Sequence, residues 1–264
     1  MELQSFLDLG TRAAREAGDL LLERWGGPAR GVDTKSTATD PVSDADRDSE
    51  RLLIEIIRKE RPDDGMIAEE TGVEASRSGI TWVLDPLDGT VNYLFDIPVW
   101  CVSIAVEDEN EALVGIVFDP NRDEMFTGLR GGGARLNGSE IHVSDKDELG
   151  TALIGTGFAY VAEARELQAR RLIRILPRVR DIRRAGSAAL DLTSVACGRI
   201  DGLYEAPMER WDKAAGSLLV TEAGGVVSDL EGPLDLSSGV IAAGAQLHDG
   251  LRSLVLGATG AASD

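Results

Sequence analysis

Apolar residues recur at helical spacing twice within the first sixty positions. A helix over residues 2–24 would carry one apolar face made of Leu3, Phe6, Leu7, Gly10, Ala14, Ala17 and Leu21. The pattern stops at Gly26-Gly27-Pro28, residues that commonly end a helix. A polar stretch from Thr34 to Thr39 leads to a second predicted helix at about 43–61, which ends before Pro62 and turns Leu52, Leu53, Ile56 and Ile57 inward.

The hydrophobic pattern then changes to short runs separated by turn residues. These runs predict strands at 66–68, 81–84, 102–106, 113–118, 124–129 and 141–143, with Asn137-Gly138 as a hairpin turn before the last one. Beyond about residue 150 predicted strands (152–156, 181–184, 201–205, 226–228, 240–243) alternate with predicted helices (162–176, 187–197, 212–223, 246–256). The pattern therefore predicts an α+β region at 1–150 followed by an α/β region at 151–264, in one compact body.

The charge balance narrows the choice of partners. The 264-residue chain has 46 acidic and 27 basic residues and a formal net charge of −19. Nucleic-acid backbones and anionic membrane surfaces both attract clustered Lys and Arg, so this composition argues against both. An anionic substrate would be repelled too, unless bound divalent cations reverse the local charge.

Cysteine and histidine are scarce, which restricts the available chemistry. Cys101 and Cys197 are far apart and neither lies in a Cys-x-x-Cys pair, which favours a reducing cytoplasm over a disulfide framework or a thiolate zinc site. Only His142 and His248 could supply imidazole, too few for a histidine-rich metal site. The first residues lack the pattern of a secretory signal, and the longest strongly apolar run, 97–106, is broken by Pro98, so no membrane segment is expected.

Two aspartates and a glycine follow an apolar run in the segment 82–90. Carboxylates three residues apart across a tight turn at the end of a strand can converge, so Asp85 and Asp88 could bind hard cations such as Mg²⁺. Gly89 and Thr90 would offer backbone N–H groups to a phosphate at the start of a helix. The alternative is a polar turn in which both aspartates cap backbone groups. This segment alone does not decide between them.

Three further acidic segments admit both a functional and an ordinary interpretation. Adjacent residues of an extended chain point to opposite faces, so only one of Glu69 and Glu70 should face a shared site, and both could be solvated. Asp212 opens a predicted helix, where an aspartate usually caps and more rarely binds metal. Asp46 follows Ser43 at capping-box spacing, which is its default role.

Taken together, these four segments resemble the inositol monophosphatase family over nearly the whole chain. The similarity rests on Asp40-Pro-Val-Ser-Asp-Ala-Asp46, Ala68-Glu69-Glu70, Asp85-Pro-Leu-Asp-Gly-Thr-Val-Asn92 and Trp211-Asp-Lys-Ala-Ala-Gly216. The combination of Asp-Pro-x-Asp-Gly-Thr with Trp-Asp-x-Ala-Ala-Gly is highly specific. The resemblance implies an α+β fold, a layered αβαβα sandwich of the sugar-phosphatase type. It also implies a homodimer and inhibition by Li⁺.

The resemblance further implies roles for individual residues. Two or three Mg²⁺ ions would be bound by the carboxylates of Glu69, Asp85, Asp88 and Asp212 and the carbonyl of Leu87. The catalytic residues would be Asp46, Thr90 and Glu69, the first two orienting a water. The substrate would contact Gly89, Thr90, Ala188, Glu205 and Asp212.

The implied reaction is hydrolysis of myo-inositol monophosphate to inositol and phosphate by a metal-activated water. No covalent nucleophile is required, in agreement with the scarcity of histidine. The expected partner is therefore a small phosphorylated polyol, not nucleic acid or membrane. Arg183 and Arg184 could face either a second subunit or a substrate anion.

Other activities remain open at this point. Fructose-1,6-bisphosphatase, histidinol-phosphate phosphatase and 3′-phosphoadenosine phosphatase belong to the same superfamily. A non-enzymatic, regulatory or RNA-associated binding protein could retain the fold, although the intact set of acidic residues argues against it.

Overall fold

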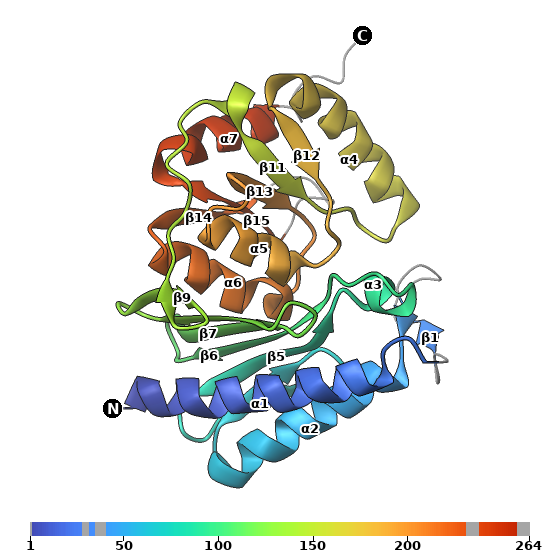
Figure 1. Cartoon of the computed structure of the whole chain (residues 1–264), viewed down its shortest axis with the longest axis vertical. Helices are drawn as coiled ribbons and strands as arrows, with labels where there is room; N and C mark the ends of the chain where they lie inside the picture. The colour runs from blue at the N-terminus through green and yellow to red at the C-terminus, as the bar shows by residue number, and fades with distance from the viewer. Residues whose placement is uncertain (1, 28–31, 35–40, 231–237, 258–264) are drawn as a thin grey trace.

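The computed structural model describes residues 2–27, 32–34, 41–230 and 238–257. Asp40 and residues 35–39 of the polar stretch lie outside the described residues. The described chain forms five layers in the order helix, sheet, helix, sheet, helix (Figure 1). This architecture confirms the predicted αβαβα sandwich.

The first layer consists of α1 (Glu2–Arg24) and α2 (Asp44–Glu60), which lie side by side on one face of the larger sheet (Figure 1). The apolar face of α1 is buried as its spacing predicts, and the ring of Phe6 meets Trp82 of the sheet edge-on at 6.0 Å. α2 begins at a capping box formed by Ser43 and Asp46. Both predicted N-terminal helices are therefore confirmed within a residue or two.

The larger sheet has eight strands in the order β10-β9-β8-β7-β6-β5-β3-β4. Only β3 and β5 are parallel; every other neighbouring pair is antiparallel. The strands are β3 (Gly65–Ala68), β4 (Gly72–Glu74), β5 (Thr81–Asp88), β6 (Cys101–Glu107), β7 (Ala112–Asp119), β8 (Glu124–Leu129), β9 (Gly133–Leu136) and β10 (Ser139–Glu140). The sequence pattern did not predict β4, whose three residues are all exposed, nor the small separate pair β1 (Asp33–Thr34) and β2 (Pro41–Val42).

The strand predicted at 141–143 is wrong by two residues. Asn137 and Gly138 both have positive φ, 48° and 81°, and form the two-residue turn that the sequence indicates. Such a turn lets pairing resume at once, so β10 is Ser139–Glu140, and Ser139 faces Leu136. By Val143 the chain has left the sheet, because the N–H of Val143 donates to the carbonyl of Ala223.

The middle layer holds α5 (Ala188–Ala196) and α6 (Arg210–Glu222), packed between the two sheets (Figure 1). The smaller sheet follows in the order β12-β11-β13-β15-β14. Its strands are β11 (Leu153–Thr156), β12 (Asp181–Arg183), β13 (Gly202–Glu205), β14 (Gly225–Leu230) and β15 (Gly239–Gly244). One apolar core joins the larger sheet to the middle helices and the smaller sheet, which places the ends of β5, β13, α5 and α6 around one region.

The outer layer consists of α4 (Ala162–Ile175) and α7 (Ala245–Gly257), accompanied by the 3₁₀ turns η1 (Leu149–Thr151) and η2 (Leu176–Arg178). A short helix, α3 (Thr90–Leu94), follows β5 directly. In the described ranges, every helix is too short or too polar to cross a bilayer. The division into regions 1–150 and 151–264 stays a prediction.

Candidate active site

A bulge near the end of β5 brings its two aspartates to one side. Asp85 is opposite Ser103 and Asp88 is opposite Cys101, so three steps on β5 match two on β6. In a regular strand, residues three apart point to opposite faces. The extra residue reverses that alternation, and both Asp85 and Asp88 line the same cleft. The strand predicted at 81–84 ends before the proline turn, whereas the observed β5 continues through that turn and pairs with β6 as far as Asp88.

Asp46 connects the start of α2 to the residues after β5. Its Oδ2 accepts hydrogen bonds from the backbone N–H and the hydroxyl of Ser43, at 2.9 and 2.6 Å. Its Oδ1 accepts from the hydroxyl of Thr90 at 2.9 Å, and that hydroxyl also lies 3.1 Å from the carbonyl oxygen of Leu87. The capping role and the site role of Asp46 therefore coexist, one on each oxygen.

Gly89 is required where β5 turns into α3. Its φ is +95°, a left-handed conformation that residues with a Cβ rarely adopt. A Cβ there would also lie 2.8 Å from the carbonyl oxygen of Val99. The conformation brings the backbone of Gly89 and the Thr90 hydroxyl to the cleft wall. The helix start predicted at Thr90 is confirmed, although α3 has only five residues.

Glu69 and Glu70 have different surroundings, as their adjacent positions predict. Glu69 lines the cleft. The backbone N–H of Glu70 donates to Oε2 of Glu50 at 2.8 Å, which ties the end of β3 to α2. Burial raises the pKa of the Glu50 carboxyl. Sequence reasoning missed Glu50 because a single glutamate within a charged helix resembles an ordinary solvated residue.

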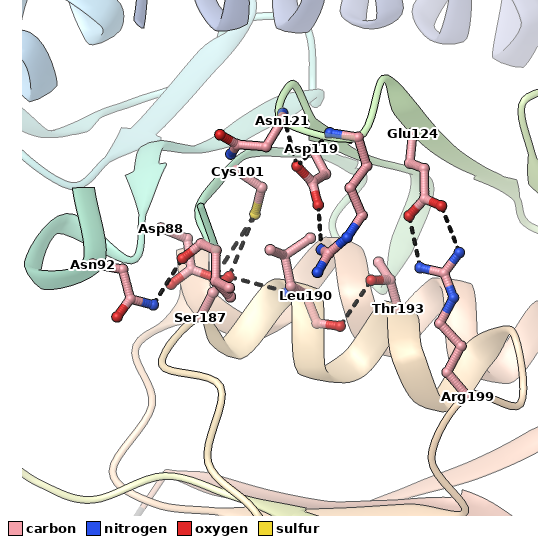
Figure 2. Close-up of polar contacts among 12 residues, drawn as sticks. Asp88, Asn92, Cys101, Asp119, Asn121, Glu124, Ser187, Leu190, Thr193 and Arg199 are labelled. Carbon is pink, nitrogen blue, oxygen red and sulfur yellow. Dashed lines mark hydrogen bonds and ion pairs between the residues drawn. The ribbon is translucent and has the colours of Figure 1, made fainter. Parts of the chain in front are cut away.

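Asp88 is held by the N-terminal end of α5. Its Oδ2 accepts from the hydroxyl of Ser187 at 2.6 Å and from the N–H of Ala189 at 2.7 Å. The thiol of Cys101, on the adjacent strand, lies 3.9 Å from the same oxygen and 3.6 Å from the Ser187 hydroxyl. Figure 2 shows Asp88 and Cys101 from the sheet meeting Ser187 from the helix layer. Cys101 is fully buried, and it also contacts the site through Asp88 and Ser187.

Asp212 lies inside the first turn of α6. The helix begins at Arg210, two residues before the predicted start. Asp212 forms a capping box with Glu209, whose backbone N–H donates to Oδ2 of Asp212 at 2.6 Å. Asp212 therefore caps the helix from its third position, because its carboxylate accepts a hydrogen bond from the backbone N–H of the cap residue, Glu209.

Nine of the ten residues predicted to bind metal or substrate or to take part in catalysis line one cleft of about 350 Å³. They are Glu69, Asp85, Leu87, Asp88, Gly89, Thr90, Ala188, Glu205 and Asp212. Asp46 is completely buried, and among the described residues that line the cleft it hydrogen-bonds to Thr90. The cleft lies where the larger sheet, the middle helices and the end of β13 come together.

The acidic groups of the cleft disfavour each other's charge. Burial, then the charges of Asp88 and Glu69, raise the pKa of Asp212 well above its ordinary value. Burial also raises the pKa of Asp88. Burial, followed by the charges of Asp191 and Asp88, raises the pKa of Glu205 to about 8. A divalent cation among these carboxylates would reverse this effect.

The donor set fits a hard cation by its chemistry. Carboxylate and carbonyl oxygens are the ligands that Mg²⁺ prefers, and the predicted set contains only these. Among the described residues, no group of three or more His, Cys, Asp or Glu side chains is already spaced to hold a metal ion. Oδ2 of Asp88 accepts from a hydroxyl and a backbone N–H, and Oδ2 of Asp212 accepts from a backbone N–H.

Sequence reasoning missed two residues near the cleft, Ser187 and Asp191. Ser187 donates a hydrogen bond to Asp88. Asp191 is buried, and burial, followed by the charge of Asp88, raises the pKa of Asp191 to about 8. Arg184 lines the cleft, whereas Arg183 pairs with Asp181. Ser187 could have been suspected from its place before an apolar helix, whereas the surroundings of Asp191 depend on tertiary contacts. The sequence named both Arg183 and Arg184 but could not tell which of them lines the cleft.

Comparisons with known proteins agree with this geometry. The profile of the inositol monophosphatase family matches residues 2–258. The chain is 41% identical over 231 residues to a Haemophilus influenzae protein named Nus factor SuhB, covering 87% of this chain and 86% of that protein. It is 39% identical over 262 residues to the inositol-1-monophosphatase of Synechocystis sp., covering 98% and 91%.

Solved structures extend the match to three dimensions. The inositol monophosphatase from Anabaena superposes with a TM-score of 0.84 at 37% identity, covering 97% of each chain. The extragenic suppressor protein suhB from Bartonella henselae gives 0.89 at 36% identity, covering 95% of this chain and 98% of that one. The chain belongs to the inositol monophosphatase family.

Proposed function

We propose that the protein is a Mg²⁺-dependent phosphomonoesterase that hydrolyses myo-inositol monophosphate to inositol and phosphate. The observation that carries the proposal is the gathering of Glu69, Asp85, Asp88 and Asp212 in one cleft beside Gly89 and Thr90. These residues come from three separate segments of the chain, and only the fold unites them. Such a set supplies hard oxygen ligands next to backbone groups that can face a phosphate.

Two or three Mg²⁺ ions would be held by the carboxylates of Glu69, Asp85, Asp88 and Asp212 and by the carbonyl of Leu87. When bound, such ions acidify an attacking water and stabilise the charge on the leaving oxygen. Their charge would also oppose the effect of burial, which raises the pKa values of Asp88 and Asp212. With the ions bound, the cleft would accept an anionic substrate despite the net charge of −19.

Asp46 and Thr90 would orient the attacking water. The Thr90 hydroxyl has one proton and two acceptors within reach, Asp46 at 2.9 Å and the Leu87 carbonyl at 3.1 Å. If the Leu87 carbonyl serves as a ligand, the proton is left to Asp46. A lone pair of the Thr90 oxygen is then free to accept a hydrogen bond from the water, which fixes the water's orientation.

Glu205 and Ala188 would face the leaving group. Oε2 of Glu205 is buried at the cleft and has no hydrogen-bond partner among the described residues. A sugar or polyol hydroxyl could donate to it. An unpartnered buried carboxylate oxygen is costly, so a ligand that satisfies it gains affinity.

Phosphate release from a substrate panel tests this proposal. We expect rapid Mg²⁺-dependent hydrolysis of inositol 1-phosphate, abolished by EDTA, inhibited by Li⁺ and nearly lost in Asp88→Asn. The panel should include fructose 1,6-bisphosphate, histidinol phosphate and 3′-phosphoadenosine 5′-phosphate. Much faster turnover of one of these would overturn the choice of inositol phosphate. Full activity in Asp88→Asn would overturn the metal assignment.

A second candidate is a regulatory or RNA-associated binding role on the same fold. It is favoured by relatives of this chain that carry the name Nus factor SuhB. Asp88→Asn separates the two roles, because removing one buried carboxylate should leave the outer surface unchanged. A binding function retained in a folded but inactive Asp88→Asn variant would show that the role does not depend on catalysis.

A further inference from the structure

Three polar side chains are buried on one face of α2. Ser49 and Glu50 follow Asp46 by three and four positions, so all three residues point the same way from the helix. Each is almost completely inaccessible to solvent. Asp46 accepts from Thr90, whereas Ser49 and Glu50 each bond to the backbone of a different segment that carries predicted metal ligands.

The ends of β3 and β5 lie side by side. The two strands pair in parallel, with Ala68 opposite Leu84. The next residues in the chain, Glu69 and Asp85, are therefore neighbours, and both line the cleft. The separation of these two carboxylates depends on how the two strand ends are held.

Ser49 holds the bulge of β5. Its hydroxyl donates to the carbonyl oxygen of Pro86 at 2.8 Å. That carbonyl belongs to the same planar peptide unit as the N–H of Leu87. The N–H of Leu87 in turn donates to Oδ1 of Asp85 at 3.0 Å. Because the peptide unit is rigid, a bond that fixes its carbonyl also fixes the N–H that orients the Asp85 carboxylate.

Glu50 holds the chain just after β3. Its Oε2 accepts from the backbone N–H of Glu70 at 2.8 Å. This N–H belongs to the peptide unit that begins at the Cα of Glu69, so the hydrogen bond fixes the backbone from which the Glu69 side chain extends. Ser49 and Glu50 are consecutive, so a single turn of α2 holds one peptide unit beside each carboxylate.

Neither residue is placed to bind an ion or a substrate directly. The described residues that line the cleft include neither Ser49 nor Glu50. The contacts of both side chains are to backbone groups next to predicted ligands. Any effect on the site is therefore exerted through the position of Glu69 and Asp85.

We propose that Ser49 and Glu50 are positioning residues that hold the carboxylates of Glu69 and Asp85 at the separation needed by the metal ions. Both hydrogen bonds come from one helix, so the two strand ends keep their relative position, and an ion does not have to order their backbones when it binds. This inference rests on the proposed Mg²⁺ site and adds to it the residues that orient its ligands.

The test is an EPR titration with Mn²⁺, which takes the same oxygen ligands as Mg²⁺, in the absence of substrate. The measured quantity is the Kd of the binding that Asp88→Asn abolishes. We expect this Kd to rise about 10- to 100-fold in Glu50→Met and about 10-fold in Ser49→Ala, as for other residues that orient metal ligands. Glu50→Gln keeps an oxygen that can accept the N–H of Glu70, so it should retain most of the affinity that Glu50→Met loses.

The double variant and two controls separate positioning from general loosening. Because Ser49 and Glu50 hold the same pair of carboxylates, the rise in Kd in the double variant should be smaller than the product of the two single effects. Thr193→Ala removes a buried hydroxyl that donates to the carbonyl of Leu190. Gln168→Met removes a buried acceptor for the N–H of Ala159, in a part of the cleft wall without predicted ligands. Both controls should leave the Kd unchanged.

An unchanged Kd in Glu50→Met and Ser49→Ala would overturn the inference. So would equal weakening in Glu50→Met and Glu50→Gln, which would assign the effect to the charge of Glu50, or similar weakening in the controls. Ser49→Ala, which removes one hydroxyl, decides the question if Glu50→Met does not fold. If the unaltered protein shows no Mn²⁺ binding that Asp88→Asn abolishes, the proposed metal site fails and this inference fails with it; normal binding by the unaltered protein confines a negative result to Ser49 and Glu50.

Discussion

The hydroxyl of Thr90 donates a 2.9 Å hydrogen bond to Asp46, a residue 44 positions earlier in the chain. The same carboxylate caps α2 through its other oxygen. The N-terminus of α2 and the turn after β5 are therefore fixed relative to each other by one fully buried side chain. A change at Asp46 should affect stability and catalysis together.

We expect Asp46→Asn to lower kcat strongly and to destabilise the fold moderately. An amide presents NH₂ in place of one oxygen, so the donors of Ser43 or of Thr90 would face another donor. The expected fall in kcat is about 10²- to 10⁴-fold, the usual contribution of proton positioning. The expected loss of unfolding free energy is about 1–3 kcal/mol. Steady-state kinetics and urea unfolding measure the two effects.

Ser43→Ala provides the control, because Ser43 bonds to Oδ2 of Asp46 and to the N–H of Ala45 but not to the oxygen of Asp46 that faces Thr90. It should cost about 1 kcal/mol of stability, as for loss of a helix cap, while kcat stays within about threefold. If Ser43→Ala lowered kcat as far as Asp46→Asn does, Asp46 would act only through the position of α2.

Ser187→Ala should weaken Mg²⁺ binding without removing any predicted ligand. Ser187 donates to Asp88 at 2.6 Å, and its loss frees that carboxylate to rotate. Residues that orient a metal ligand typically contribute about 10- to 100-fold in affinity or activity. The Mg²⁺ concentration at half-maximal activity should rise accordingly.

Thr193→Ala is the matched control for Ser187→Ala. Thr193 is also a buried hydroxyl residue of α5, but it donates to the carbonyl of Leu190 and does not contact Asp88 (Figure 2). It should cost about 1 kcal/mol of stability and leave the Mg²⁺ requirement unchanged. A similar Mg²⁺ shift in both variants would mean that general loosening of α5 is responsible.

The sequence predicted most of the architecture and the site where local patterns were strong. The periodicity of α1 and the capping box of α2 are local properties. Each helix begins and ends within a residue or two of the predicted positions. The two motifs ending in Thr90 and beginning at Trp211 contain six of the nine predicted site residues that line the cleft.

What the sequence did not predict depends on register and on contacts between distant segments. The bulge that turns Asp85 and Asp88 to one face exists only in the pairing of β5 with β6. The separate surroundings of Arg183 and Arg184 are likewise invisible in a pair of identical adjacent residues. Such features depend on tertiary packing, which the hydrophobic periodicity of the sequence does not indicate.

The raised pKa of Glu205 predicts that the metal-free protein loses stability as pH rises. In the folded state this pKa is about 8, against an ordinary value near 4.5 in the unfolded chain. Between these values the folded state retains a proton that the unfolded state has released, so the free energy of unfolding falls with rising pH. One such group contributes a slope of at most about 1.4 kcal/mol per pH unit.

Glu205→Gln should therefore flatten the pH dependence of unfolding measured between pH 5 and 8 in EDTA. Glu163→Gln, at an exposed position on α4, should leave the slope unchanged. A slope unaffected by Glu205→Gln would show that this carboxyl titrates normally. Mg²⁺ should reduce the slope in the unaltered protein, because a cation favours the ionised carboxylates.

Gly115→Ala should impair activity from outside the cleft. Gly115 lies on β7 against α6, where an added Cβ would be 2.7 Å from the carbonyl oxygen of Ala215. The backbone of α6 must then move, and Asp212 lies one turn away on that helix. We expect a stability loss of about 1–3 kcal/mol from overpacking. Activity should fall by up to about 100-fold, since small displacements of positioning groups are costly.

Gly150→Ala, where a Cβ would meet nothing within 4 Å, should change neither quantity. Loss of stability with unchanged kcat in Gly115→Ala would mean that Asp212 keeps its place independently of where α6 packs on β7.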